Sequence, residues 1–384
     1  MPKLGMPNVD IAFKEKGIEA VQRSQHGIEM LLLEEDSTTI ETLMKEHTEG
    51  TATVAAIKNP FTLYTIDGIP ASLSAENKDY ITKSFIGYQK SPRRVKVYLM
   101  AKTESTEADK YTESLKAIAN ENWDYLAIPT IAEAQKETVG TWIKNQRDNM
   151  KNRIKAVLPA YKGDNEGIIN FTNTFIETST KKYTGAEYTP RIAGLICGTP
   201  MTISATYAPL SEVVNCDQYD QDERDEKVNN GEFFIWYDKE KFKMSRAMNS
   251  LVTTGQDKLE AYQTIKTVDI MDMMYVDIRK TAQDSYIGKY TNDYDNKCLL
   301  MSAIKGYFLE LEKGKLLKKG QSTIALDIEA IKNWRISNGK NTEEELADMS
   351  DQEIKELDTK KKVFLKASVV ILDAMEDISL DVDI

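Results

Sequence analysis

The hydrophobic and polar positions of the chain change their period several times along its length. Between residues 95 and 171, short apolar runs alternate with segments in which apolar residues recur every three or four positions. Strands that alternate with helices in this way form a mostly parallel sheet with helices on both faces. The expected strands are 95–100, 123–128, 153–158 and 167–171, and the expected helices are 106–121 and one that begins at a capping box of Thr130 and Glu133.

The region before this block is dominated by short strand patterns. They cover residues 28–33, 51–57 and 61–66, and turn signals at Asn59-Pro60 and Asp67-Gly68 separate them. A helix is expected over residues 74–85. We therefore predict a small β-rich domain ahead of the α/β domain.

The region after the block is mixed. A short helix is expected over residues 188–197, and a strand over 233–237 lies opposite a strand over 242–244. A long helix is expected over 264–284 and a polar helix over 343–357. The acidic stretch from Asp217 to Glu226 does not have the ligand spacing of a calcium loop, so we interpret it as a solvated loop.

Both ends of the chain have the two-residue period of a strand. At the beginning, Val9, Ile11 and Phe13 alternate with other residues, and at the end an apolar strand over 363–372 is followed by another alternating segment. Such strands either pair within the subunit or add to the sheet of a neighbour, and the sequence leaves both outcomes open. The apolar positions of the last segment are Ile378, Leu380, Val382 and Ile384.

These patterns give a multidomain chain of α/β and α+β class. We expect five segments. They are an N-terminal arm (1–20), a small β-rich domain (21–92), an α/β domain (93–262), a mixed C-terminal domain (263–362) and a C-terminal strand with its arm (363–384).

Composition excludes several classes of function. The chain has 384 residues, with 50 Lys and Arg against 61 Asp and Glu, so its net charge of −11 disfavours general nucleic-acid binding. No apolar run approaches the roughly 18 residues that a membrane span needs, and we expect synthesis in a cytoplasm. The three cysteines lack metal-ligand spacing, so we expect buried free thiols and no metal or cofactor.

Catalytic motifs are not evident. The two histidines, His26 and His47, precede the α/β domain whose strand ends would carry a site, and no glycine-rich phosphate loop follows the first strand. We therefore expect no enzyme, with a carboxylate-dependent α/β hydrolase as the weakest alternative. A basic stretch from Lys305 to Lys319 is either a solvated face or a surface for an acidic protein partner.

Three segments resemble contractile tail sheath proteins of phages with Gram-positive hosts and of phage-tail-like bacteriocins. They are MPNVDIAFKEKG at residues 6–17, YTPRIAGLIC at 188–197 and FLKASVVILDAMED at 364–377. The resemblance extends over the whole chain and includes the order of its domains. It implies that the small β-rich domain is a β-sandwich, that the α/β domain is of the kind called subtilisin-like, and that the protein is a structural subunit.

The resemblance also implies a mode of assembly. Such sheaths form stacked hexameric rings around a tail tube, exchange terminal strands between neighbours, and contract when the baseplate triggers them. On this basis Val9, Ile11 and Phe13 form the N-terminal arm strand, and Ile378, Leu380, Val382 and Ile384 form the C-terminal one. From charge alone we assign Lys313, Lys315, Lys318 and Lys319 to the surface that faces the tube.

The expected partners are therefore further copies of the chain, a tail tube protein, and baseplate and tail terminator proteins. Nucleic acid and membranes are not expected partners. The alternative is a shell or surface-array protein that has the same arms but no tube. The sequence does not distinguish a DNA-delivering phage from a headless bacteriocin.

Overall fold

The computed structural model describes residues 20–23, 25–49, 52–103, 107–255 and 258–382. It divides the chain into two compact units. The first, here called the α/β unit, contains residues 23–276 and the C-terminal residues from 371. The second, here called the C-terminal unit, contains residues 277–370 together with the described residues before Arg23.

The centre of the α/β unit is a seven-stranded sheet in the order β12-β8-β7-β6-β1-β5-β4. Its strands pair in parallel, except that β4 is antiparallel to β5. All eight residues of β1 are buried, as expected for a parallel strand with helices on both of its faces. The strands are β1 (Ile28–Glu35), β4 (Phe61–Leu63), β5 (Arg94–Ala101), β6 (Tyr125–Ala127), β7 (Lys155–Pro159), β8 (Ile168–Phe171) and β12 (Glu232–Phe233).

The expected β-sandwich is not what residues 21–92 form. Strands β1 and β4 belong to the seven-stranded sheet, and β1 lies between β5 and β6 near its middle. The physical reason is that β1 is apolar on both faces: Leu31 and Leu33 enter one hydrophobic core, whereas Met30 and Leu32 enter the other. A separate hairpin is formed by β2 (His47–Glu49) and β3 (Ala52–Val54), and α1 (Ser37–Leu43) precedes it.

Helices cover both faces of this sheet. On one face α2 (Ala75–Ile86) packs against α5 (Thr189–Cys197), and a side chain in place of Gly194 would meet the carbonyl oxygen of Ser84 at 2.1 Å. On the other face lie α3 (Thr112–Ile118) and α4 (Glu133–Asp148). Helix α4 does not begin at the expected capping box. The N–H of Ala132 donates to Gln135, whereas Thr130 donates to Glu34.

Smaller elements complete the α/β unit. The predicted pairing with residues 242–244 is confirmed for residues 235–237, which form the β13–β14 hairpin, whereas Phe233 belongs to β12 and pairs with Phe171 of β8. The acidic stretch is a helix from Gln221 onward rather than a loop throughout, because the Asp220 carboxylate accepts from the N–H of Glu223 and acidic residues favour a helix N-terminus. These elements are β9 (Phe175–Thr178), β10 (Lys182–Thr184), β11 (Val213–Cys216), α6 (Gln221–Asn229), β13 (Ile235–Tyr237), β14 (Phe242–Met244) and the 3-10 turns Ile66–Gly68 and Glu260–Tyr262.

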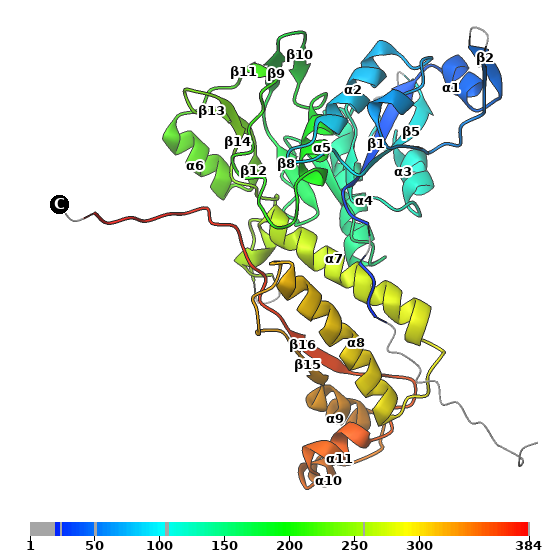
Figure 1. The fold of residues 1–384 in the computed structure, drawn as a ribbon, viewed down its shortest axis with the longest axis vertical. Helices are drawn as coiled ribbons and strands as arrows, with labels where there is room; N and C mark the ends of the chain where they lie inside the picture. Colours follow the sequence, from blue (N-terminus) through cyan, green and yellow to red (C-terminus); the bar gives the residue numbers. More distant parts are fainter. Residues whose placement is uncertain (1–19, 24, 50–51, 104–106, 256–257, 383–384) are drawn as a thin grey trace, which may run out of the picture. The chain divides into compact units, whose positions relative to one another are not determined.

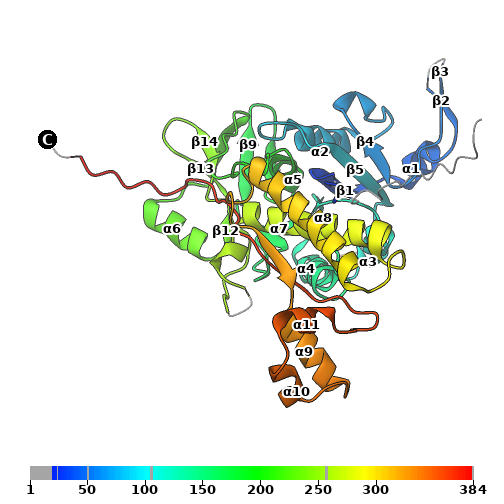
Figure 2. The same ribbon diagram turned by 60° about the horizontal axis from the view of Figure 1, so that its bottom comes forward.

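The chain passes into the C-terminal unit within helix α7 (Ile265–Thr281), which a π-helical turn, Ala282–Tyr286, continues. The predicted polar helix over 343–357 is two helices, because Ser350 caps a new one. Helices α9, α10 and α11 lie together (Figure 2), and Leu326, Ile331 and Ile354 are buried among them and the adjoining sheet. The elements are α8 (Tyr294–Lys313), β15 (Thr323–Leu326), α9 (Ile328–Ser337), α10 (Glu343–Ala347), α11 (Asp351–Glu356) and β16 (Leu365–Ser368).

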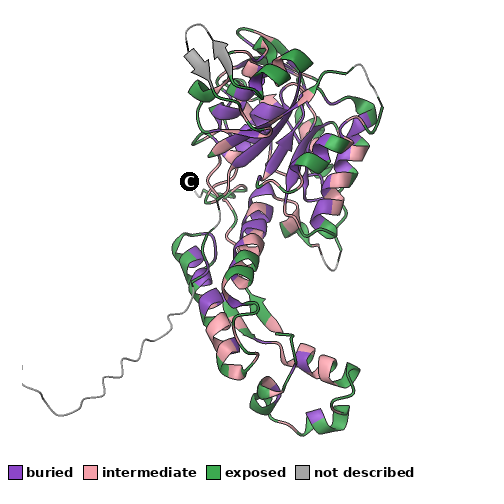
Figure 3. Cartoon of the chain, turned by 90° about the vertical axis from the view of Figure 1, so that its right-hand side faces the viewer, coloured by how far each residue is buried: buried purple, intermediate pink, exposed green. Residues whose placement is uncertain are grey.

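Burial differs strongly along the chain. Buried residues concentrate in the seven-stranded sheet and its helices, whereas β15, β16 and the last helices carry mostly exposed or partly exposed residues (Figure 3). The α/β part is therefore the region that can hold side chains in fixed positions. The description of that domain as subtilisin-like stays a prediction, as do the boundaries of the five segments.

Candidate assembly interface

The C-terminal segment from Ile378 onward is here called the arm, and its described residues, 378–382, are extended and exposed (Figure 1). Within the described residues it forms no helix or strand (Figure 1). The exposed fractions of Ile378, Leu380 and Val382 are 85%, 79% and 69%. An aliphatic side chain of this size gains about 1.5–3 kcal/mol on burial, so three of them in water form a surface suited to a partner. Ile384 lies outside the described residues, as do the three predicted N-terminal arm residues, Val9, Ile11 and Phe13.

Residues 372–377, here called the arm root, are by contrast bound to the α/β unit. The ammonium group of Lys266 donates to the carbonyl oxygen of Leu372, and Thr267 donates to Asp373 at 3.5 Å. The hydroxyl of Thr206 donates to Glu376 at 2.6 Å. The guanidinium group of Arg246 lies 3.3 Å from Glu376 and also contacts Asp377. The last of these contacts is made by Asp377, so the bound part of the segment ends there.

The C-terminal unit contains a small two-stranded sheet, β15–β16. Ile324 lies opposite Ala367 and Leu326 opposite Leu365, so apolar residues share one face, whereas Ala325 lies opposite the exposed Lys366 on the other. Within the described residues, no backbone hydrogen bond joins the outer edge of either strand to another segment. A two-stranded sheet is marginally stable in water, and free edges can accept a further strand.

The four lysines assigned to the tube-facing surface lie at the end of α8 and in the turn after it, and all four are exposed. Leu316 and Leu317 are buried between them and fix the turn to the body of the unit. The Glu312 carboxylate accepts from the N–H groups of Gly320 and Ser322 at 2.9 and 3.2 Å, and these bonds hold the pKa of Glu312 below its usual value. The exposed lysines, here called the lysine cluster, are Lys313, Lys315, Lys318 and Lys319.

Lys305 does not belong with the lysine cluster. It is partly buried, and its ammonium group donates to the carbonyl oxygen of Ser322. The basic stretch of the sequence is therefore divided: its first lysine stabilises the turn, and the last four project from it.

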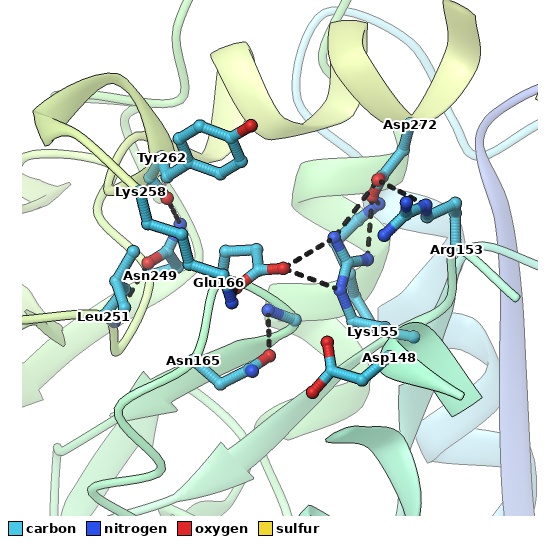
Figure 4. A network of polar contacts seen from close by, with 12 residues as sticks. Asp148, Arg153, Lys155, Asn165, Glu166, Asn249, Leu251, Lys258, Tyr262 and Asp272 are labelled. Carbon is cyan, nitrogen blue, oxygen red and sulfur yellow. Dashed lines mark hydrogen bonds and ion pairs between the residues drawn. The ribbon is translucent and has the colours of Figure 1, made fainter. Parts of the chain in front are cut away.

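A second group of charges, here called the buried ion cluster, lies under the amino ends of β7 and β8 (Figure 4). Arg147, in the last turn of α4, contacts both oxygens of Asp272 at 2.8 and 3.1 Å. Lys155, the first residue of β7, lies 2.8 Å from Asp272 and 3.1 Å from Asp269. Glu166 lies 3.4 Å from Arg147 and 2.7 Å from Lys258.

The electrostatics of this cluster are those of a paired network. Burial alone would raise the pKa of Asp272, but Lys155 and Arg147 hold it below its usual value. Burial would lower the pKa of Lys155, yet Asp272 and Asp269 raise it to about 12. Burial raises the pKa of Asp269, whose carboxylate also accepts from the hydroxyl of Tyr125 at 2.7 Å. The pairs fix the first half of α7 to the amino ends of the strands.

The space beside this cluster is too small for a substrate. A cavity of about 20 Å³ is lined by residues that include Ile196, Lys266 and Asp269, and it has room for a single water. In the described part of the chain, no group of three or more His, Cys, Asp or Glu side chains is arranged to hold a metal ion. No helix there is both long and apolar enough to cross a bilayer.

The usual ligand position of an open α/β sheet is also filled. The strand order changes direction at β1 and β6, and ligands bind such sheets at the carboxyl ends of the strands next to that point. Here the Glu34 carboxylate occupies the position. It accepts from Tyr111 at 2.9 Å and Thr130 at 2.8 Å, and it pairs with Lys110 at 2.9 Å.

The histidine prediction was partly wrong. His26 lies within the α/β unit just before β1, where its Nδ1 is 3.4 Å from Asp124. This is the amino end of the sheet, opposite to the ligand position. The Asp124 carboxylate accepts from the N–H groups of Gly27 and Ile28 at 2.7 and 2.9 Å, so it closes the turn into β1.

Two family models match the sequence. The phage tail sheath protein central domain matches residues 104–250, and the phage tail sheath C-terminal domain matches residues 257–384. A tail sheath protein of Clostridium phage phiCD119 is 35% identical over 381 residues, which cover 98% of this chain and 99% of that protein. The chain belongs to the phage tail sheath protein family. The family resemblance inferred from the sequence is therefore confirmed.

Solved structures agree in fold with this sheath protein. A sheath tail protein from Desulfitobacterium hafniense superposes with a TM-score of 0.63 at 16% identity, covering 83% of this chain and 94% of that one. The sheath of an extracellular contractile injection system in its contracted state superposes with a TM-score of 0.62 at 11% identity, covering 100% and 98%. Sheath proteins are structural, so membership points away from catalysis.

The structure brings together residues of the sheath protein that the sequence analysis did not connect. Arg246 and Thr206 were not assigned a role, and their contacts with the arm root join positions 131 and 170 residues apart. The buried ion cluster was also missed. Its one visible signal was the pair Asp269 and Asp272, which interrupts the apolar face of the predicted helix over 264–284.

Proposed function

We propose that this sheath protein polymerises as stacked hexameric rings around a tail tube and contracts to drive the tube through a target cell envelope. The observation that carries the proposal is the exposed apolar face of the arm. Ile378, Leu380 and Val382 are more exposed than a stable monomer favours, and they alternate with polar residues as a strand does. Burial of these side chains against another copy removes the free-energy cost of exposing them to water.

The β15–β16 sheet of a neighbouring subunit is the surface that best fits the arm. It has free edges, one apolar face, and a polar face that carries Lys366. The arm has the same two-sided pattern, with Ser379 and Asp381 on its polar side. Strand addition would therefore extend the apolar face, and a carboxylate beside Lys366 would be a favourable cross-strand pair.

Contraction in this proposal moves each subunit nearly as a rigid body while exchanged arms keep the subunits connected. The internal pairing of the α/β unit supports this, because the buried ion cluster and continuous cores resist deformation. The extended sheath would be metastable, with better packing between subunits in the contracted state as its energy source. The baseplate would trigger the change, and a terminator protein would close the other end.

The lysine cluster would face the tube before contraction. Its four exposed ammonium groups suit an acidic tube surface, and an interface held by exposed charges can release when the sheath moves. The protein would be made in a bacterial cytoplasm, assembled into the tail of a phage or bacteriocin particle, and released by lysis.

Removal of the arm tests this function. We expect a chain without residues 378–384 to fold as a soluble monomer, because the described residues of the deleted segment, 378–382, are exposed. The full chain should form striated tubes of uniform diameter in negative-stain electron microscopy. The triple variant Ile378→Ser, Leu380→Ser and Val382→Ser should behave as the deletion does.

The matched control changes the polar side of the same segment, by Ser379→Ala with Asp381→Asn, and should still form tubes. Tubes formed by the deleted chain would contradict strand exchange. Closed shells or flat arrays from the full chain would instead favour the alternative of a shell protein without a tube.

A further inference from the structure

The arm root ends in a contact that differs from ordinary surface pairing. A single guanidinium group, that of Arg246, contacts the carboxylates of two consecutive residues, Glu376 and Asp377. In extended chain, consecutive side chains point to opposite sides of the backbone. One group that holds both therefore restricts the rotation of the backbone at this point as well as its position.

The residue that makes this contact is itself held in place. Arg246 lies between the buried Ser245, which directly follows β14, and the buried Ala247. The N–H of Ala247 donates to the hydroxyl oxygen of Thr206 at 2.9 Å, and the same hydroxyl donates to Glu376 at 2.6 Å. Thr206 thus connects the backbone beside Arg246 with the carboxylate that Arg246 binds.

We propose that Arg246, supported by Thr206, is the anchor that fixes where the arm leaves the subunit and in which direction, and so sets its register on a second copy of the chain. The inference rests on the proposed function, because it assigns a positioning residue to the strand exchange. Arg246 acts on the arm through the root and does not itself contact the partner copy.

The distance between anchor points shows why Arg246 matters. Without Arg246, the Thr206–Glu376 hydrogen bond is the remaining described contact beyond Asp373, and once that single bond opens the last fixed position is Asp373, held by Thr267, next to Leu372, held by Lys266. Four residues, 374–377, would then join the free arm. Each extended residue spans about 3.3 Å, so the start of the arm could move by about 13 Å. A shift of one residue turns the apolar face of a strand outward, so this freedom is enough to lose the register.

The first experiment measures the anchor in the unassembled chain by hydrogen–deuterium exchange. We expect Arg246→Gln to raise deuterium uptake in peptides covering 371–377 by at least about three-fold, with the uptake of β7 and β8 unchanged. The double variant Glu376→Gln with Asp377→Asn removes the carboxylates that Arg246 binds and leaves the core unchanged. It should raise the deuterium uptake by the same amount. Lys241→Gln, a change of an exposed residue in the neighbouring β13–β14 turn, is the matched control and should leave the uptake unchanged.

The second experiment reverses the charges. Arg246→Glu should raise the protein concentration needed for tube formation by about 3- to 10-fold, because a longer free tether lowers the effective concentration of the arm and weakens its register. Combining it with Glu376→Arg and Asp377→Arg should restore most of the wild-type value. Unchanged uptake in residues 371–377 of the Arg246→Gln chain, or a triple variant that performs no better than Arg246→Glu alone, would overturn the anchor.

The two proposals fail separately. If a chain without residues 378–384 forms tubes, the proposed strand exchange is wrong. The hydrogen–deuterium exchange measurement on unassembled chains then still decides whether Arg246 holds the arm root. If that deletion blocks tubes while all Arg246 variants match the wild type, only the anchor is wrong.

Discussion

The buried ion cluster and the lysine cluster contain similar side chains in opposite environments. Lys155 is buried and paired with two carboxylates, whereas Lys315 and the other lysines of its cluster are exposed to water. A buried charge must be paired within the fold, because removing it from water costs several kcal/mol. An exposed lysine contributes little to its own fold and stays available to a partner. The first group therefore holds the subunit together, and the second can bind something else.

The largest expected effect comes from removing one carboxylate of the buried ion cluster. Asp272→Ala leaves Arg147 and Lys155 buried with fewer partners, and it should lower the free energy of unfolding by about 3–5 kcal/mol. Chemical denaturation measures this. Asp148→Ala is the control, because Asp148 is an exposed carboxylate directly after Arg147. Equal losses in the two variants would show that the pairs in the cluster do not stabilise the fold.

Acid should weaken the same cluster by a smaller amount. The pKa values of Asp272 and Glu166 are lowered in the folded chain because Arg147 and the lysines favour their charged forms. Their contribution is complete above the unfolded pKa values near 4 and is lost as the pH falls through the folded ones. Unfolding curves at pH 7, 5, 4 and 3 should show a steep loss of stability below about pH 4. In Asp272→Asn the loss should be shallower, and an unchanged slope would assign the acid sensitivity to other groups.

The lysine cluster should give the smallest effect on stability. Changing Lys315, Lys318 and Lys319 to Glu should alter the unfolding free energy by no more than about 0.5 kcal/mol per site. It should nevertheless abolish co-assembly with the tail tube, as measured by co-sedimentation. The control set changes three exposed lysines of the α/β unit, Lys58, Lys90 and Lys241, and should keep co-assembly. If both sets behave alike, the position of the lysine cluster has no special role in tube binding.

Local patterns predicted the elements whose cause is local. The cap of α2 at Ser74 and the β13–β14 hairpin depend on residues a few positions apart, and both are present. The acidic helix α6 was missed because it has no apolar face, and its cap at Asp220 is the signal that could have shown it. The break between α10 and α11 was visible only as Ser350 followed by Glu353.

Long-range features could not be predicted from one sequence. The strand β1 has the length and composition of a sandwich strand, and only its partners β5 and β6 place it in the larger sheet. Arg147 meets Asp272 across 125 positions. In the candidate interface, the sequence showed the arm as an alternation of apolar residues. The contacts of the arm root with Arg246 and Thr206 could not be predicted, because these two residues belong to no motif.

The order of segments along the chain determines when the arm root and its binding residues are synthesised. Thr206, Arg246 and Lys266 are translated more than 100 residues before the residues that they hold, and residues 277–370 of the C-terminal unit are translated in between. The residues that hold the arm root are therefore synthesised long before the arm root itself. The arm root therefore meets a surface whose residues are already in place when the root is synthesised.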